Sequence, residues 1–97
     1  MPVVIEIMTF RLEVGVDESL FRAVDERVQV GFAYQQRGFL RRTLGRHGDR
    51  WLVLQVWVSA DAADAAQEAF DASPLGTEFL ALLESDSISI ERFEGVD

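Results

Sequence analysis

The sequence predicts a small α+β domain in which one antiparallel sheet of four strands carries helices on one face. The first observation is the order of patterns along the chain: an extended segment, an amphipathic helix, a hairpin, a broken helix and a last extended segment. The second is the length of 97 residues, which suits one domain. The third is a glycine-aspartate pair between two extended segments, which is typical of a hairpin turn. We therefore expect residues 1–97 to form a single domain.

Residues 3–12 are rich in β-branched and aromatic residues, which predicts the first strand. Asp17 follows as the expected N-cap of a helix that ends at Gly38. At about 100° per residue, seven side chains of this helix fall within one arc of about 120°. They are Leu20, Phe21, Val24, Val28, Gly31, Phe32 and Gln35. Six of them are suited to a core, whereas Gln35 puts an amide near the centre of the arc.

Residues 39–58 form the predicted hairpin, with its turn at Gly48-Asp49. A two-residue loop is favoured, and a three-residue loop would reverse the pairing of faces. The two-residue loop groups on one face Leu40, Arg42, Leu44, Trp51, Val53, Gln55 and Trp57. In either register the opposite face of the second arm carries Leu52, Leu54, Val56 and Val58.

Ser59 is the expected N-cap of the next helix, whose sheet-facing side carries Ala63, Ala66 and Phe70. Ser73-Pro74 interrupts this helix, because proline disfavours helical geometry at the residue before it and suits the first turn of a new helix. The new helix presents Leu75, Phe79, Leu82 and Leu83, and residues 88–93 form the last strand. The resulting βαββαβ order is that of ferredoxin-like domains.

Both faces of this sheet are apolar in the sequence. Residues 51–58 are apolar at seven of eight positions and residues 3–8 at five of six, whereas a sheet with one wet face alternates apolar and polar residues. Two helices cover only one face, so the other requires a partner. We expect a two-fold homodimer that pairs through its sheets into an α+β barrel, with an interface on the order of 2,000 Å².

Composition argues against several classes of partner. A formal net charge of −8 opposes binding to nucleic acid, and no apolar run approaches the roughly 20 residues that span a membrane. With one histidine and no cysteine, we expect no metal site and a cytoplasmic location. Arginines concentrate in the hairpin, where they either guide an anionic ligand or form a solvated face: Arg41, Arg42, Arg46 and Arg50.

Three short motifs carry a resemblance to a known superfamily. They are R-G-F-L at 37–40, W-L-V-L-Q-V-W-V-S at 51–59 and F-D-A-S-P at 70–74. With this order of elements, the chain resembles the dimeric α+β barrel superfamily, and within it the antibiotic biosynthesis monooxygenase-type proteins. The resemblance implies that Trp57 matches the tryptophan that ends the third strand and that Ser73 matches the serine after the second helix. Relatives often carry a histidine at the position of Phe70, so haem chemistry is not implied here, and no cofactor is expected.

A pocket between helices and sheet is the candidate site, because large apolar side chains with a few polar groups are the usual lining of a small-molecule site. Its expected wall consists of Phe32, Gln35, Val53, Gln55, Trp57, Phe70 and Phe79. The two amides receive a ligand, or they bond to each other or to the backbone, or Gln55 points into the dimer. Glu6 interrupts the apolar first strand. It is either a desolvated base, or it lies near an edge or pairs with an arginine such as Arg42 or Arg92.

Three functions are compatible with such a pocket. The first is a cofactor-independent monooxygenase-like enzyme that orients a small hydrophobic or aromatic substrate. The second is a non-catalytic protein that binds the same ligand, and the third is a structural or regulatory dimer with a filled core. The sequence predicts the site for the first two but does not choose among the three.

Overall fold

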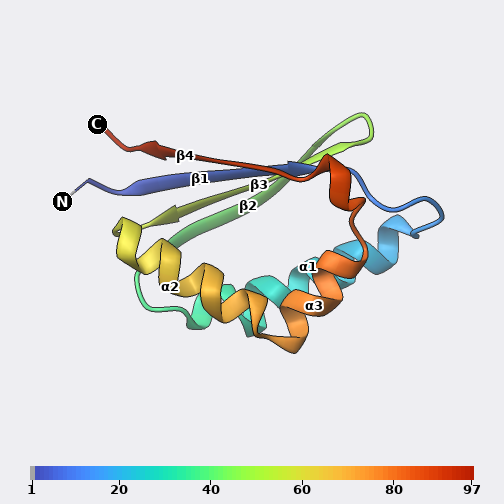
Figure 1. Ribbon diagram of the computed structural model, residues 1–97, viewed down its shortest axis with the longest axis horizontal. Helices are drawn as coiled ribbons and strands as arrows, with labels where there is room; N and C mark the ends of the chain where they lie inside the picture. Colours follow the sequence, from blue (N-terminus) through green and yellow to red (C-terminus); the bar gives the residue numbers. More distant parts are fainter. Residues whose placement is uncertain (1) are drawn as a thin grey trace.

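The computed structural model describes residues 2–97 and contains four strands and three α-helices (Figure 1). The strands are β1 (Val4–Phe10), β2 (Phe39–His47), β3 (Arg50–Trp57) and β4 (Ser89–Glu94). The helices are α1 (Glu18–Gly31), α2 (Ala60–Asp71) and α3 (Pro74–Ala81), with short 3₁₀ turns at η1 (Ala33–Gln35) and η2 (Ser85–Ser87). Over residues 2–97, no helix combines the length and the apolar character needed to cross a bilayer.

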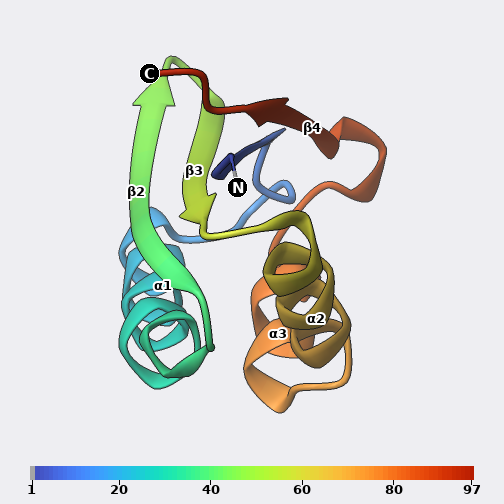
Figure 2. The same cartoon turned by 90° about the vertical axis from the view of Figure 1, so that its left-hand side faces the viewer.

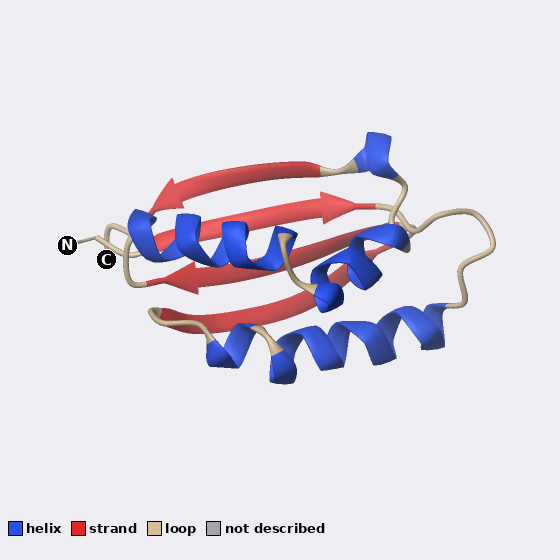
Figure 3. Cartoon of the chain, turned by 60° about the horizontal axis from the view of Figure 1, so that its bottom comes forward, coloured by secondary structure: helices blue, strands red, loops and turns tan. Residues whose placement is uncertain are grey.

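The strands form one antiparallel sheet in the order β2-β3-β1-β4. All three helices lie on the same side of this sheet, and its opposite side is bare (Figures 2 and 3). In Figure 2, α1 lies below β2, whereas α2 and α3 lie on the side of β4. The predicted ferredoxin-like arrangement is therefore confirmed.

The hairpin has the two-residue loop that the sequence favoured. His47 pairs with Arg50, and Gly48 has a φ of +63°, as a two-residue turn with glycine in its first position requires. This register puts the row from Trp51 to Trp57 against the helices. A bulge between Phe39 and Arg41 changes one expectation: Phe39, not Leu40, pairs with Trp57, and Leu40 is 51% exposed.

Helix α1 begins as predicted but ends earlier than Gly38. The Asp17 carboxylate accepts a hydrogen bond from the Ser19 amide, so the predicted N-cap is confirmed. The α-helix stops at Gly31 and tightens into η1, which turns Gln35 out of the predicted apolar arc and leaves it exposed. Leu20, at one edge of that arc, is also half exposed.

The main core lies at the end of the sheet where β1 ends and β3 begins. Four rings pack there edge to face or tilted, with Phe21 at the centre: its ring centroid lies 5.8 Å from Phe10, 4.9 Å from Trp51 and 5.6 Å from Phe79. A second, smaller cluster at the other end joins Trp57 to Ala63 and Ala66 of α2. Small alanines at this end leave room between α2 and the sheet.

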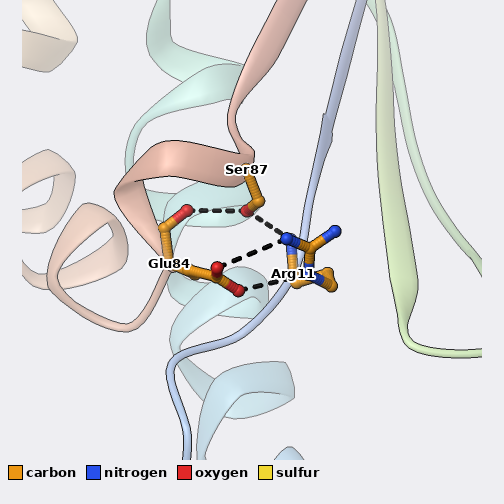
Figure 4. Close-up of polar contacts among 3 residues, drawn as sticks. All are labelled: Arg11, Glu84 and Ser87. Carbon is orange, nitrogen blue, oxygen red and sulfur yellow. Dashed lines mark hydrogen bonds and ion pairs between the residues drawn. The ribbon is translucent and has the colours of Figure 1, made fainter.

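A polar contact ties the end of β1 to the connection that leads into β4 (Figure 4). The Arg11 amide donates to the Ser87 hydroxyl at 2.8 Å, and that hydroxyl donates to the Glu84 carbonyl at 2.6 Å. The Arg11 guanidinium also bonds both oxygens of the Glu84 carboxylate, which raises the pKa of Arg11 above its usual range. These contacts fix the start of the edge strand β4.

Gly38 cannot be replaced without strain. Its φ is +84°, and a Cβ atom there would lie 2.7 Å from Ala62 Cβ and 2.8 Å from Val58 Cγ2. We expect Gly38→Ala to lower the free energy of unfolding by about 2–4 kcal/mol, the sum of left-handed strain and overpacking. Urea denaturation measures this change.

Two other glycines are controls for Gly38. Gly48 shares the positive φ but has open space around it, so Gly48→Ala should cost only about 1–2 kcal/mol. Gly15 also has a positive φ, +86°, with open space around it, and Gly15→Ala should cost about the same as Gly48→Ala. Equal effects at all three positions would contradict the steric argument.

Candidate functional site

A cavity of about 220 Å³ lies between the sheet and the helices, at the Trp57 end of β3. Its lining extends to exposed residues of α2 and β4, Asp71 and Ile90, so it reaches the surface between these two elements. For comparison, an apolar cavity of about 150 Å³ in another protein binds benzene. The space is therefore large enough for a molecule of one or two rings.

Six of the seven residues predicted for the pocket wall line this cavity: Phe32, Val53, Gln55, Trp57, Phe70 and Phe79. The ring of Phe70 connects two of the others, with centroid distances of 5.2 Å to Phe32 and 6.0 Å to Phe79. The prediction for Gln35 is wrong: this residue does not line the cavity, and its amide donates to the Val30 carbonyl at the surface. The early end of α1 explains the difference.

Trp57 lines the cavity and carries a buried donor without a partner in the described part of the chain. Its side chain is 2% exposed, and its indole Nε1 has no hydrogen-bond partner within residues 2–97. A buried donor without a partner costs about 1–3 kcal/mol, so such groups are rare in native proteins. An acceptor on a bound molecule is one way to satisfy it.

A row of polar side chains crosses the helix-facing side of the sheet, one from each strand. The register aligns Arg42 (β2) with Gln55 (β3), Gln55 with Glu6 (β1), and Glu6 with Arg92 (β4). We call these four residues the polar row. Its members Arg42, Gln55 and Glu6 line the cavity, which therefore has aromatic walls and a polar floor.

The β2 end of the polar row is a buried ion pair. Asp25 of α1 receives two hydrogen bonds from Arg42, at 2.6 Å and 3.1 Å, and the two side chains are only 8% and 3% exposed. Asp25 was not predicted as a site residue, because it falls about 20° beyond the edge of the predicted apolar arc. A signal was available in the sequence. An acidic residue lies close to the edge of the arc, and Arg42 lies on the inward face of the hairpin, so the two could have been predicted to pair.

The β4 end is a network of three charges. Arg92 donates through Nε to Glu6 Oε2 at 2.9 Å and through Nη1 to Asp64 of α2 at 2.5 Å. The hydrogen bond to Asp64, together with the hydrogen bond to Glu6 and the charges of both carboxylates, raises the pKa of Arg92 above its usual range. Glu6 thus forms the ion pair with Arg92 that was one of its predicted roles, and it is also buried within the cavity floor.

Other candidate groups lie away from the cavity. His47 is exposed beside the turn of the hairpin. Arg41, Arg46 and Arg50 are exposed, whereas Arg42 is buried, so the four hairpin arginines do not form one anion-binding face. Within residues 2–97, no three histidine, aspartate or glutamate side chains converge as metal ligands would.

Solved structures of other proteins share this arrangement of strands and helices. SnoaB, a cofactor-independent oxygenase from Streptomyces nogalater, superposes with a TM-score of 0.79 at 24% identity, over 100% of this chain and 96% of that one. The chain shares this ferredoxin-like fold. A candidate antibiotic biosynthesis monooxygenase from Bordetella bronchiseptica gives a TM-score of 0.81 at 16% identity, over the full length of both chains. Rv0793 from Mycobacterium tuberculosis gives 0.72 at 17% identity, over 98% and 96%.

Comparison of sequences is less informative than comparison of structures. No protein-family model matches the chain, and a search of curated proteins finds no match. At these identities the ferredoxin-like fold is shared while most side chains differ. The residues that line the cavity are therefore the evidence for function.

Proposed function

We propose that the cavity binds a small aromatic molecule and that the protein oxidises this molecule with oxygen, without a cofactor. The observation that carries the proposal is the aromatic cavity with the buried, unpartnered indole N–H of Trp57. An acceptor on the ligand, such as a carbonyl oxygen, would satisfy this donor. The shared fold of SnoaB, a cofactor-independent oxygenase, supports the same chemistry.

Without a cofactor, the electrons that reduce oxygen come from the substrate. Conversion of an activated methylene group to a carbonyl supplies four electrons, so one oxygen molecule yields the carbonyl oxygen and one water. The contribution of the protein is then to orient an electron-rich substrate and to exclude bulk water. Phe32, Phe70 and Phe79 supply the apolar walls for this purpose.

Oxygen consumption with a panel of quinols and polyphenols, measured alongside binding of the same compounds, tests the proposal. Turnover supports the oxygenase. Binding without turnover would indicate a carrier or sensor. If nothing in the panel binds, the alternative is a structural or regulatory dimer.

Two glutamine variants locate the site. Gln55→Leu removes an amide that lines the cavity, so we expect ligand affinity to fall about fivefold, the value of one hydrogen bond of about 1 kcal/mol. Gln35→Leu makes the same chemical change at an exposed position and should leave binding unchanged. Titration by intrinsic tryptophan fluorescence measures both. Equal losses in the two variants would contradict the assignment of this cavity.

We also propose that the protein is a homodimer that pairs through the bare face of the sheet. On that face, cross-strand pairs join Ile5 to Val56 and Ile7 to Leu54, and Phe93 beside Ile5 is 47% exposed. Exposed apolar patches of this kind are typical of interfaces.

The cytoplasmic location expected from the sequence stays a prediction.

Charges at the edges of the bare face favour a second copy as its partner. Arg41 lies beside Val56 at the β2 edge, and Glu91 lies beside Ile7 at the β4 edge. A two-fold axis through the face brings the surface of each protomer against the same surface of the other. Opposite charges on its two edges are suited to such pairing.

A further inference from the structure

We propose that Glu6 selects the ligand of the cavity by accepting a hydrogen bond from a neutral hydroxyl group on its aromatic ring. This inference rests on the proposed function, since it assumes that the cavity binds an aromatic molecule. It adds the polar group that the molecule must carry, and it assigns that specificity to one residue.

The geometry leaves one carboxylate oxygen of Glu6 available. Arg92 bonds to Oε2 at 2.9 Å, whereas no hydrogen bond within residues 2–97 reaches Oε1. The side chain is 8% exposed and lines the cavity, so a donor on a bound ligand can reach a carboxylate that bulk water does not surround. Hydrogen bonds to a charged acceptor are about twice as strong as those between neutral groups.

Arg92 is the positioning residue for this carboxylate. It bridges Glu6 in the cavity floor to Asp64 on α2, across the same two elements between which the cavity reaches the surface. Because Asp64 holds the other end of the guanidinium, Arg92 fixes Glu6 in one orientation. The free oxygen of Glu6 is thereby available to the ligand rather than to a second arginine contact.

The charges around the cavity disfavour an anionic ligand. Arg42 is bonded twice to Asp25, and Arg92 is bonded to both Glu6 and Asp64. Two guanidinium groups therefore face three carboxylates, and the exposed Asp71 also lines the cavity. A ligand carboxylate would have to break an existing ion pair, whereas a neutral hydroxyl needs only the free oxygen of Glu6.

Three naphthalene probes of similar size test this inference by isothermal titration calorimetry: 1-naphthol, 1-methylnaphthalene and 1-naphthoate. Hydroxyl and methyl groups are nearly isosteric, so the first two probes differ mainly in the donor. We expect the intact protein to bind 1-naphthol about tenfold more tightly than 1-methylnaphthalene, and 1-naphthoate most weakly. If burial of apolar surface alone determined affinity, 1-methylnaphthalene would bind more tightly than 1-naphthol.

Variants of Glu6 separate its role from that of the cavity. In Glu6→Gln the preference for 1-naphthol should fall to about threefold, since a neutral acceptor remains, and in Glu6→Met it should reverse. The ratio of the two affinities is compared within each variant, because Glu6 lines the cavity floor and its replacement changes the affinity for both probes. Binding of 1-methylnaphthalene shows that each variant is folded.

The possible outcomes distinguish this inference from the proposed function. If 1-methylnaphthalene binds but 1-naphthol has no advantage, or if the advantage survives in Glu6→Met, the inference is wrong and the aromatic cavity stands. Failure of every probe to bind the intact protein overturns both.

Discussion

Replacing Asp25 with asparagine should lower the free energy of unfolding by about 3–5 kcal/mol, because it leaves the guanidinium of Arg42 buried without its counter-charge. The two side chains are 8% and 3% exposed, so water cannot replace the lost carboxylate. Urea denaturation of the variant and the parent protein gives the difference. Because Arg42 also lines the cavity, ligand affinity should fall in the same variant.

Two controls distinguish a buried charge from a general loss of contacts. The double variant Asp25→Leu, Arg42→Met removes both charges and should recover most of the lost stability, since apolar pairs often replace buried ion pairs at no cost. Glu78→Gln breaks the exposed pair with Arg27, whose side chains are 44% and 54% exposed, and should cost less than about 1 kcal/mol. If Asp25→Asn costs no more than Glu78→Gln, the pair is not structural.

Leu54→Glu should convert the proposed dimer into monomers or prevent folding. Leu54 lies in the middle of the bare sheet face, between Ile7 on β1 and Thr43 on β2. A carboxylate there would be buried without a partner in the dimer, at a cost of several kcal/mol per subunit. Light scattering coupled to size-exclusion chromatography measures the mass in solution.

The control for this variant makes the same substitution on the helical side. Leu20 is 51% exposed on α1, so Leu20→Glu should keep both the fold and the mass of the parent protein. A parent protein that is monomeric at micromolar concentration, or a Leu54→Glu variant that remains a dimer, would refute pairing through the sheet.

The inner face of the hairpin was predictable because its turn has few solutions. Gly48-Asp49 matches a two-residue loop, and that loop fixes the pairing of every residue up to the bulge. It therefore predicts that Arg42 and Leu44 share the face of Val53, Gln55 and Trp57. No sequence pattern predicts the bulge that pairs Phe39, in place of Leu40, with Trp57, since the bulge depends on how β2 meets η1.

The position of Gln35 was not predictable from periodicity. A helical wheel assumes about 100° per residue throughout, and it fails once the chain tightens into a 3₁₀ turn. The wheel assigned Gln35 to the centre of the apolar arc, while the actual inward polar residue is Asp25. The contact with Arg42 decides this, and it joins residues 17 apart in sequence.

Sequence patterns alone predicted the order of the elements, the helix caps at Asp17 and Ser59, the break at Ser73-Pro74, the favoured pairing of the hairpin and the aromatic composition of the cavity. Each of these depends on local chemistry within a few residues. The polar floor depends on tertiary structure, because the strand order β2-β3-β1-β4 brings Arg42, Gln55, Glu6 and Arg92 into one row. Their charges come from distant parts of the chain, and no local pattern predicts which of them meet.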